Sequence, residues 1–288
     1  MPDRRIAVVT DSTSSLTVEE AAEHGIVVIP LQVIIGATSY DEGVDGASPQ
    51  MVADALKKFT PVSTSRPTPT GMLEAYQRLA DEGYDEIIAL HLSGEMSGTF
   101  DSARVAAREA PIPVHAVDTR QVGPAVGHAA MAAAAAIAGG ATGEEAVELA
   151  TSLAEASTTL FYVDTLEYLR RGGRVGSAAA FIGGALAVKP LLRIEDGTID
   201  SFEKVRTAGK ALARLEDLAV EAAGERRVNV VVAHLSSPDR AEQLATKIST
   251  RVELAAPIRT AELGAVLGAH VGPGMVALCV TPADPSDI

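Results

Sequence analysis

From Ile87 to Phe100 the chain reads Ile-Ile-Ala-Leu-His-Leu-Ser-Gly-Glu-Met-Ser-Gly-Thr-Phe. The first four residues are apolar and predict a buried strand, and the amphipathic run 101–110 that follows predicts a helix. Between them lie Ser, Gly and Thr, where backbone N–H groups and hydroxyls gather at a helix N-terminus. This strand–turn–helix unit predicts an anion-binding cradle in an α/β fold.

Two other hydroxyl-rich turns predict further walls for this cradle. Residues 11–15 read Asp-Ser-Thr-Ser-Ser, and residues 63–68 read Ser-Thr-Ser-Arg-Pro-Thr. The sequence contains no Gly-x-Ser-x-Gly elbow and no Gly-x-x-x-x-Gly-Lys-Ser/Thr loop. We therefore expect a neutral, hydrogen-bonding cradle rather than an activated nucleophile or a nucleotide-binding loop.

Strand and helix patterns alternate through the first half of the chain. Strands are expected at residues 6–9, 26–35, 86–90 and 114–117. Helices are expected at residues 17–24, 49–59, 70–82, 99–110 and 143–156, with an Ala-rich helix after residue 117. Thr17 precedes Glu19 and Glu20, which is typical of a helix start. This alternation predicts a parallel sheet covered by helices on both faces.

The pattern changes after about residue 158. Extended runs are expected at residues 159–163, 191–194, 198–202, 228–233, 255–261 and 276–280. Asp196 and Gly197 separate two of these runs, which is a strong hairpin signal. We therefore expect two domains: an α/β domain with a parallel sheet over residues 1–158, and an α+β domain with an antiparallel sheet over residues 159–288.

The charge balance is strongly acidic, with a formal net charge of −14 over 288 residues and a pI of about 4.9. This argues against nucleic-acid binding and against charge-driven binding to an anionic membrane, and it leaves transient membrane contact open. The apolar stretch 125–140 is too short and too alanine-rich to span a bilayer. No signal peptide fits the N-terminus. We therefore expect a soluble, cytoplasmic protein.

Metal and redox chemistry find little support in the sequence. Cys279 is the single cysteine, and the six histidines lack zinc-type spacing. Asp11 and Asp118 both follow predicted strands, where a carboxylate can hold magnesium or accept N–H bonds of the next turn; the second role is favoured. We expect no metal and no cofactor.

Basic and imidazole side chains supply the remaining candidates. Arg170, Arg171 and Arg174 fall within five residues. A solvated loop and a contact with phosphate or an acidic partner both stay open for them, and Arg206 extends the surface. His270 lies among small residues at 268–274, so other groups can approach it closely. It is either a structural hydrogen-bond partner or a carboxylate ligand.

An enzyme is the alternative to a binding module. Ser93, His270 and Asp118 could form a Ser/His/Asp set in a stand-alone hydrolase or transferase acting on a small carboxylate or phosphate compound. Hydroxyls that cap turns explain any single serine better. A structural protein without a ligand is the third interpretation.

The chain resembles the DegV family of bacterial fatty-acid-binding proteins over essentially its whole length. The resemblance rests on Val-Thr-Asp-Ser-Thr-Ser at 9–14, Thr-Ser-Arg-Pro-Thr at 64–68, Leu-Ser at 92–93 with Ser-Gly-Thr-Phe-Asp-Ser-Ala at 97–103, Leu-Arg-Arg-Gly-Gly-Arg-Val at 169–175, and His-Val-Gly-Pro-Gly at 270–274. These motifs are weak singly and specific in their order and spacing.

The resemblance implies a lipid carrier that holds one fatty acid in a tunnel between its two domains and is not itself catalytic. The implied carboxylate-binding residues are Thr64, Ser65, Ser93 and His270. The implied secondary pocket residues are Arg66, Gly94, Ser97, Gly98 and Thr99. A separate ATP-dependent fatty acid kinase is implied to make an acyl phosphate, a phospholipid precursor, with the kinase or the phosphate contacted by Arg170, Arg171, Arg174 and Arg206.

Two positions depart from the family pattern. Arg66 stands where the family usually has Gln, which adds a charge near the headgroup. Gly94 stands where a second Ser is common, which removes one hydroxyl. The apolar run 181–188 predicts core or, between two domains, a tunnel wall.

Overall fold

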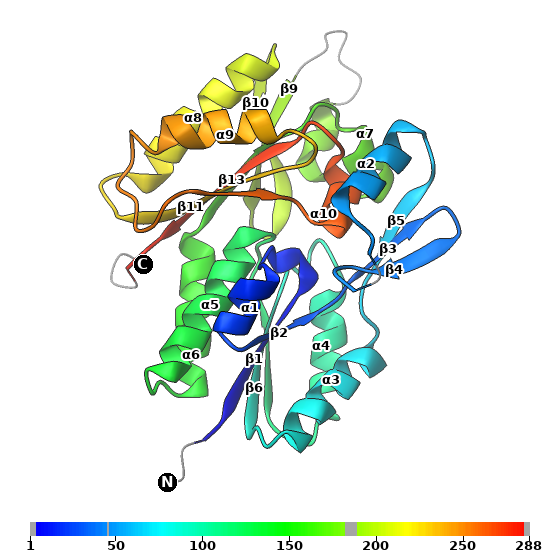
Figure 1. Ribbon diagram of the computed structural model, residues 1–288, viewed down its shortest axis with the longest axis vertical. Coiled ribbons are helices and arrows are strands. Elements are labelled where there is room, and N and C mark those ends of the chain that lie inside the picture. Colours follow the sequence, from blue (N-terminus) through cyan, green and yellow to red (C-terminus); the bar gives the residue numbers. More distant parts are fainter. Residues whose placement is uncertain (1–3, 45, 182–188, 285–288) are drawn as a thin grey trace. The chain divides into compact units, whose positions relative to one another are not determined.

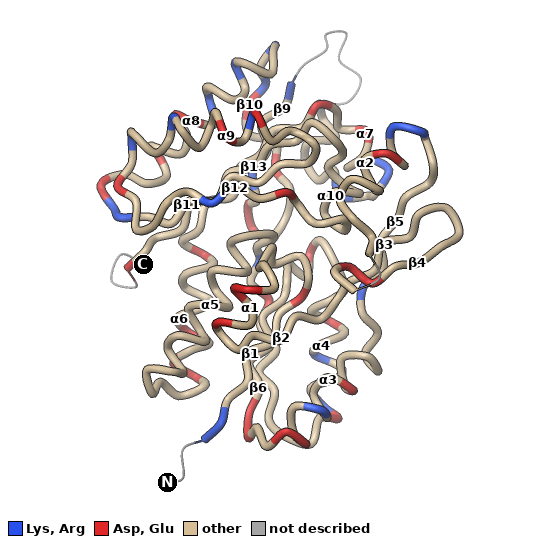
Figure 2. The backbone as a smooth tube through the Cα atoms, viewed as in Figure 1, with Lys and Arg blue, Asp and Glu red and all other residues tan. Residues whose placement is uncertain are grey.

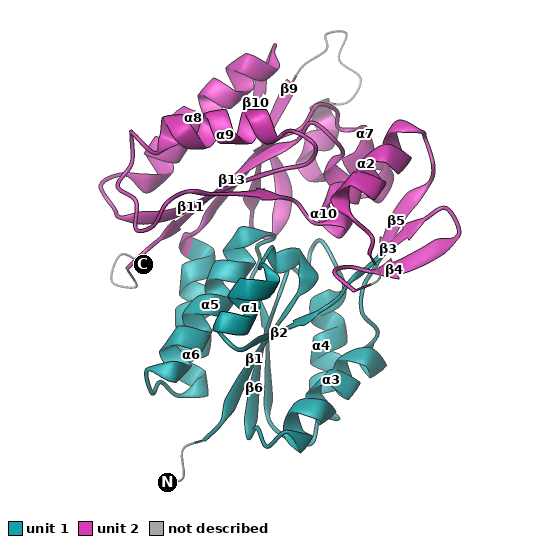
Figure 3. Ribbon diagram, in the orientation of Figure 1, with its two compact units in different colours: residues 1–32, 65–155 teal, residues 33–64, 156–288 magenta. Residues whose placement is uncertain are grey.

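The computed structural model describes residues 4–44, 46–181 and 189–284 (Figure 1). The chain forms two compact units, each assembled from two stretches of sequence (Figure 3). Unit 1 contains the residues up to Gln32 and Ser65–Glu155, and unit 2 contains Val33–Thr64 and the residues from Ala156 onward. The boundary expected after residue 158 lies close to the last division, and Val33–Thr64 belongs with unit 2. Two independent domains at 1–158 and 159–288 stay a prediction.

Unit 1 contains a four-stranded parallel sheet in the order β2–β1–β6–β7, which confirms the predicted α/β architecture. Its strands are β1 Ile6–Asp11, β2 Ile26–Ile29, β6 Glu86–His91 and β7 Val114–Asp118. Its helices are the 3₁₀ turn η1 Ser12–Ser14, α1 Val18–Glu23, α3 Pro69–Asp81, α4 Thr99–Ala107, α5 Pro124–Ala138 and α6 Gly143–Ala156. Thr17 caps α1 as expected, in a reciprocal pair with Glu20.

Alternate residues of β1 and β6 cover opposite faces of this sheet. Val9 and Ala89 pack with α3 and α4 in one buried cluster. Val8 and Ile88 pack with α5 and α6 in another, and Figure 1 shows these helices on the two sides of the sheet. Because both faces are buried, polar side chains concentrate where the strands end.

The strand order creates a switch point between β1 and β6. β2 lies on one side of β1 and β6 lies on the other. Ligands of open α/β sheets bind outside the carboxyl ends of the strands at such a point. The turns that follow Asp11 and His91 both begin there, which is where the sequence predicts hydroxyls to gather.

Unit 2 contains a six-stranded sheet in the order β10–β9–β8–β13–β11–β12. Its strands are β8 Thr158–Tyr162, β9 Lys189–Glu195, β10 Thr198–Val205, β11 Val228–His234, β12 Arg259–Glu262 and β13 Val276–Pro282. Its helices include α7 Glu167–Gly172, η2 Gly176–Phe181, α8 Ala208–Ala223, α9 Pro238–Ile248 and α10 Ala265–Val271.

Pairing in this sheet is antiparallel, as predicted, for the described strands except β11 and β12, which are parallel. The helix α9 connects these two strands, and a crossover of this kind returns the chain in the same direction. The hairpin prediction is confirmed at β9–β10. Asp196 (φ 49°) and Gly197 (φ 77°) both adopt the left-handed conformation that its two-residue turn requires.

The segment Val33–Thr64 contributes a small sheet and one helix to unit 2. The sheet has the order β4–β3–β5, with β3 Gln32–Ile35, β4 Thr38–Asp41 and β5 Val62–Ser65. The helix α2 Pro49–Lys57 packs against α10. The expectation of a turn at 63–68 is wrong for residues 63–65, because β-branched Val62 and Thr64 favour a strand once β3 offers a partner.

Two further expectations concern apolar segments. Of the predicted core or tunnel run 181–188, residues 182–188 lie outside the described residues. Within the described part of the chain, no helix is both long enough and apolar enough to cross a membrane.

Candidate functional site

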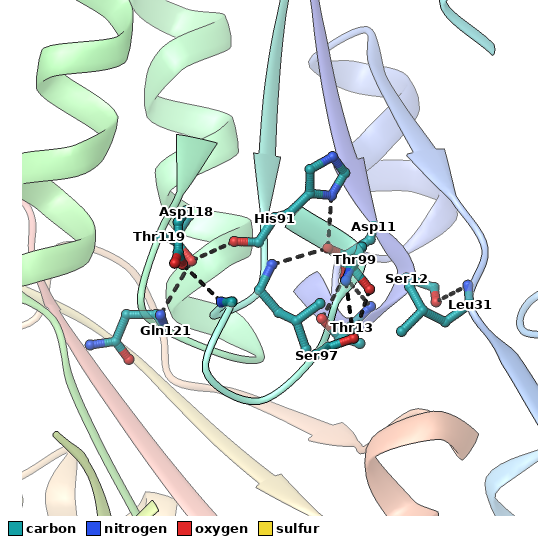
Figure 4. Close-up of polar contacts among 12 residues, drawn as sticks. Asp11, Ser12, Thr13, Leu31, His91, Ser97, Thr99, Asp118, Thr119 and Gln121 are labelled. Carbon is teal, nitrogen blue, oxygen red and sulfur yellow. Dashed lines mark hydrogen bonds and ion pairs between the residues drawn. The ribbon is translucent and has the colours of Figure 1, made fainter. Parts of the chain in front are cut away.

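Asp11 is the centre of a buried polar network at the carboxyl edge of the unit 1 sheet (Figure 4). One carboxylate oxygen accepts the N–H of Thr13 at 3.1 Å and its hydroxyl at 2.5 Å. The other accepts Nδ1–H of His91 and the N–H of Leu92, both at 3.0 Å. The carboxylate therefore ties the turn after β1 to the end of β6, in the N–H-accepting role that the sequence favours.

The turn after β6 uses its hydroxyls locally. Ser93 is fully buried, and its hydroxyl accepts the N–H of Glu95 at 3.2 Å. The carbonyl of Ser93 accepts the N–H groups of Met96 and Ser97, both at 3.1 Å. The hydroxyls of Ser97 and Thr99 lie 2.9 Å apart, and in Figure 4 they lie on the opposite side of Asp11 from the His91 ring. Ser97 and Thr99 thus join the Ser93 turn, as their spacing predicts.

Gly94 allows this turn to close on Asp118. Its N–H donates to Oδ1 of Asp118 at 3.1 Å, and the N–H of Arg120 donates to the same oxygen at 2.9 Å. A Cβ at position 94 would lie 2.9 Å from Oδ2 of Asp118. A serine at this position would therefore require the carboxylate to move, which gives a physical reason for the missing hydroxyl.

Unit 2 contains a pocket of about 460 Å³ whose lining includes residues from α7, α10 and the segment before β5. Thr64, His270, Arg171 and Arg174 all line it, together with apolar and aromatic side chains such as Phe59. No Asp or Glu is among its described lining residues. The protein has a net charge of −14, and acidic residues occur along the whole described chain (Figure 2), yet this pocket has a basic lining.

His270 and Thr64 form the polar centre of the pocket. Oγ1 of Thr64 and Nε2 of His270 are 2.8 Å apart. The other ring nitrogen, Nδ1, is buried without a hydrogen-bond partner. Gly172 makes room for it, since a Cβ there would lie 2.2 Å from Nδ1.

The protonation of His270 follows from these surroundings. Burial, and then the positive charge of Arg174, lower the pKa of His270 to about 4, so the ring is neutral at pH 7. We assign its one proton to Nε2, because an N–H at Nδ1 would be buried without an acceptor and would lie near the positive charge of Arg174. Nε2–H then donates to Thr64, and the Thr64 hydroxyl proton is free to bind a ligand.

The arginines of the basic run have different surroundings. Arg170 and Arg171 both bind the carboxylate of Glu167, at 2.8 and 2.7 Å, and hydrogen bonds from Arg170 and then Arg171 lower the pKa of Glu167 to about 2. Arg174 donates to the carbonyl of Gly172. Arg171 and Arg174 line the pocket, whereas Arg170 and Arg206 are not among its lining residues.

The candidate residues therefore divide between the two units. Thr64, His270, Arg171 and Arg174 come together in unit 2, whereas Arg170 and Arg206 belong to the same unit outside the pocket. Unit 1 contains Ser65, Arg66, Ser93, Gly94, Ser97, Gly98 and Thr99. The division falls between Thr64 and Ser65, which are neighbours in β5.

The sequence analysis missed several lining residues of the pocket, among them both of its described aromatic residues, Tyr168 and Phe59. Tyr168 precedes Arg171 and Gly172 by three and four positions, so helical spacing puts these residues on one face of α7. Phe59 follows α2 and is 81% exposed, with a left-handed backbone at φ 58°. The signal for Tyr168 was therefore present in the sequence, whereas the exposure of Phe59 depends on the fold.

Metal ligands do not cluster in the part of the chain that the structure describes: no group of three or more His, Cys, Asp or Glu residues has a suitable arrangement.

Comparison with known proteins gives the family. A family model described as "Uncharacterised protein, DegV family" matches residues 5–283. The chain belongs to the DegV family. A DegV domain-containing protein of Streptomyces coelicolor is 50% identical over 278 residues, which cover 96% of this chain and 99% of that protein.

Solved DegV structures share the fold along nearly the whole chain. A DegV family protein from Thermus thermophilus, described by its fatty acid binding, superposes with a TM-score of 0.91 at 30% identity, covering 96% of this chain and 99% of that one. DegV from Bacillus subtilis, described as a fatty acid binding protein, gives a TM-score of 0.88 at 33% identity, with 97% and 99% coverage.

Proposed function

We propose that this DegV family protein is a fatty-acid carrier that presents the carboxylate of its ligand to a separate ATP-dependent fatty acid kinase. The proposal is carried by the lining of the unit 2 pocket, whose described residues include no Asp or Glu and combine the Thr64–His270 pair with Arg171 and Arg174. Fatty acid binding by two solved relatives supports the same ligand class. A cytoplasmic location and a ligand tunnel stay predictions.

Uncharged hydroxyl and imidazole groups can bind the carboxylate of a fatty acid through hydrogen bonds. We assign the carboxylate to Thr64, Ser65, Ser93 and His270. In this assignment the neutral imidazole orients the Thr64 hydroxyl, which donates to the carboxylate and avoids an unpaired buried charge. Each buried methylene contributes about 0.8 kcal/mol, so a sixteen-carbon chain gains on the order of 12 kcal/mol before the costs of association.

A carrier of this kind needs no base of its own. The lowered pKa of His270, about 4, leaves the ring neutral, and the hydroxyl of Ser93 accepts a backbone N–H. The phosphoryl group comes from ATP on the kinase, and Arg171 and Arg174 are proposed to contact the kinase or the phosphate. Arg170 and Arg206 are proposed as outer contacts of the same partner.

The ligand is identified by native mass spectrometry of the purified protein, followed by lipid extraction and gas chromatography. We expect a stoichiometric adduct that extracts as a fatty acid. A protein at bare chain mass that takes up neither palmitate nor oleate would contradict the proposal. Turnover of an ester or phosphate substrate without a partner protein would favour the stand-alone hydrolase or transferase.

Variants test the residue assignments. Ser93→Ala and His270→Ala are expected to weaken retention of palmitate while the fold survives, and Ser249→Ala, at an exposed serine after α9, serves as the control. Arg174→Glu is expected to retain palmitate and to lose kinase-dependent phosphorylation. Unchanged retention in both site variants would reject the carboxylate assignment.

A further inference from the structure

Arg66 lies over the end of the Ser93 turn. Its Nη1 donates to the carbonyl oxygen of Gly98 at 3.1 Å, and the N–H of Ser102 donates to the same oxygen at 3.0 Å. Arg66 and Gly98 both belong to unit 1, so this bond joins the residue after Ser65 to the end of the turn that begins with Ser93. The guanidinium is thus held at the carbonyl of Gly98, at the end of the turn that begins with Ser93, one of the proposed carboxylate-binding residues.

Gly98 provides the space for this guanidinium. A Cβ at position 98 would lie 1.7 Å from Nη1 of Arg66. The backbone of Gly98 has a φ of −73°, which any residue can adopt. Glycine at this position therefore lets the guanidinium approach the backbone, and a larger residue would displace this exposed side chain without disturbing the backbone conformation.

The charge of Arg66 is not neutralised within the described part of the chain. Its side chain is exposed and makes one hydrogen bond, to a carbonyl, and no ion pair with a described carboxylate. The carboxylate in the first turn of α4, Asp101, binds Arg104 at 3.0 Å. Of the five N–H donors of a guanidinium, most remain for a ligand.

We propose that Arg66 is a specificity-determining residue that binds the phosphate of the acyl phosphate more strongly than the carboxylate of the free acid. The inference rests on the proposed function. The hydroxyls of the proposed carboxylate-binding residues carry no charge and do not discriminate between a monoanion and a dianion. In contrast, the attraction between a fixed positive charge and a headgroup grows with the charge of the headgroup. The guanidinium fork also matches two phosphate oxygens at once.

Three ligands with one sixteen-carbon chain separate the headgroup from the tail: hexadecanol, palmitate and hexadecyl phosphate. Dissociation constants are measured at pH 8 for the wild type and for Arg66→Gln. We expect the substitution to weaken the binding of hexadecyl phosphate by about tenfold, to weaken that of palmitate by about threefold or less, and to leave that of hexadecanol unchanged. The selective loss of affinity for hexadecyl phosphate should shrink at high salt.

Two variants make the test specific. Gly98→Ala retains Arg66 but displaces its guanidinium, so it is expected to reproduce the selective loss of hexadecyl phosphate. Arg104→Gln removes an exposed arginine of α4 that binds Asp101, so its affinities should match the wild type.

The outcomes separate this inference from the proposed function. Equal losses for palmitate and hexadecyl phosphate in Arg66→Gln, or no loss in either, would overturn the role of Arg66 while the carrier function stands. A wild type that binds none of the three ligands would overturn both.

Discussion

The polar edge of unit 1 and the pocket of unit 2 differ in how their donors are used. At the edge, Asp11 and Asp118 accept N–H groups and a hydroxyl from the turns around them. In the pocket, no described carboxylate is present, and Arg171, Arg174 and the Thr64–His270 pair line the space. At the edge, donors of the surrounding turns bind the carboxylates of Asp11 and Asp118, whereas in the pocket the hydroxyl proton of Thr64 is left for a ligand.

The comparison shows that a region rich in Ser and Thr does not necessarily offer hydroxyl protons to a ligand. The edge is rich in Ser and Thr, yet the hydroxyl of Thr13 already donates to Asp11, and that of Ser93 accepts the N–H of Glu95. In the pocket, the hydroxyl of Thr64 is oriented by a neutral imidazole. A donor is available to a ligand only where no acceptor of the chain has taken it.

The largest expected effect is on the edge. Asp11→Ala removes the acceptor of His91, Thr13 and Leu92 in a fully buried position, so we expect the free energy of unfolding to fall by about 3–5 kcal/mol. Urea denaturation measures it. Asp101→Ala, at an exposed ion pair, is the matched control and should cost less than about 0.5 kcal/mol. Equal losses in both variants would remove the structural role assigned to the edge.

The next effect is in the pocket. Gly172→Ala puts a Cβ where it would lie 2.2 Å from Nδ1 of His270. We expect the ring to shift, the free energy of unfolding to fall by about 1–3 kcal/mol and palmitate affinity to fall with it. In Gly209→Ala, a control within α8, the new Cβ meets no atom within 4 Å, and the helix should gain about 0.5–1 kcal/mol. Wild-type palmitate affinity in Gly172→Ala would contradict the pocket assignment.

A pH titration probes the neutral imidazole. His270 has a folded-state pKa of about 4 against 6.5 for an unperturbed histidine, so the unfolded chain binds its proton first as the pH falls. As the pH falls from about 6.5 to about 4, the free energy of unfolding of the wild type is therefore expected to decrease relative to that of His270→Gln, by on the order of 2 kcal/mol. The difference between the two unfolding curves measures this loss. Parallel curves would show that the ring is not desolvated.

The smallest effect is expected at Arg170. Its partner Glu167 keeps the ion pair with Arg171, and all three side chains are well exposed. Arg170→Ala should therefore leave the midpoint of thermal unfolding unchanged at both low and high salt. A clear drop in the midpoint at both salt concentrations would give the basic run a structural role and weaken its assignment to a partner.

Local signals in the sequence predicted much of the fold. Thr17 and Glu20 cap α1 within one turn, and Asp196 and Gly197 form the turn between β9 and β10. Both features depend on residues within a few positions of one another. The helix α8 was not predicted, and His270 was expected among small residues and lies in α10.

The sequence by itself determined the family, the parallel sheet and the residue types of the candidate site, because side-chain periodicity and turn chemistry act over short distances. Only the tertiary structure decided that Val33–Thr64 joins unit 2 and that Thr64 meets His270, which is 206 positions away. The location of the imidazole proton followed from that contact, because burial, a missing acceptor and the charge of Arg174 exist only in the folded chain.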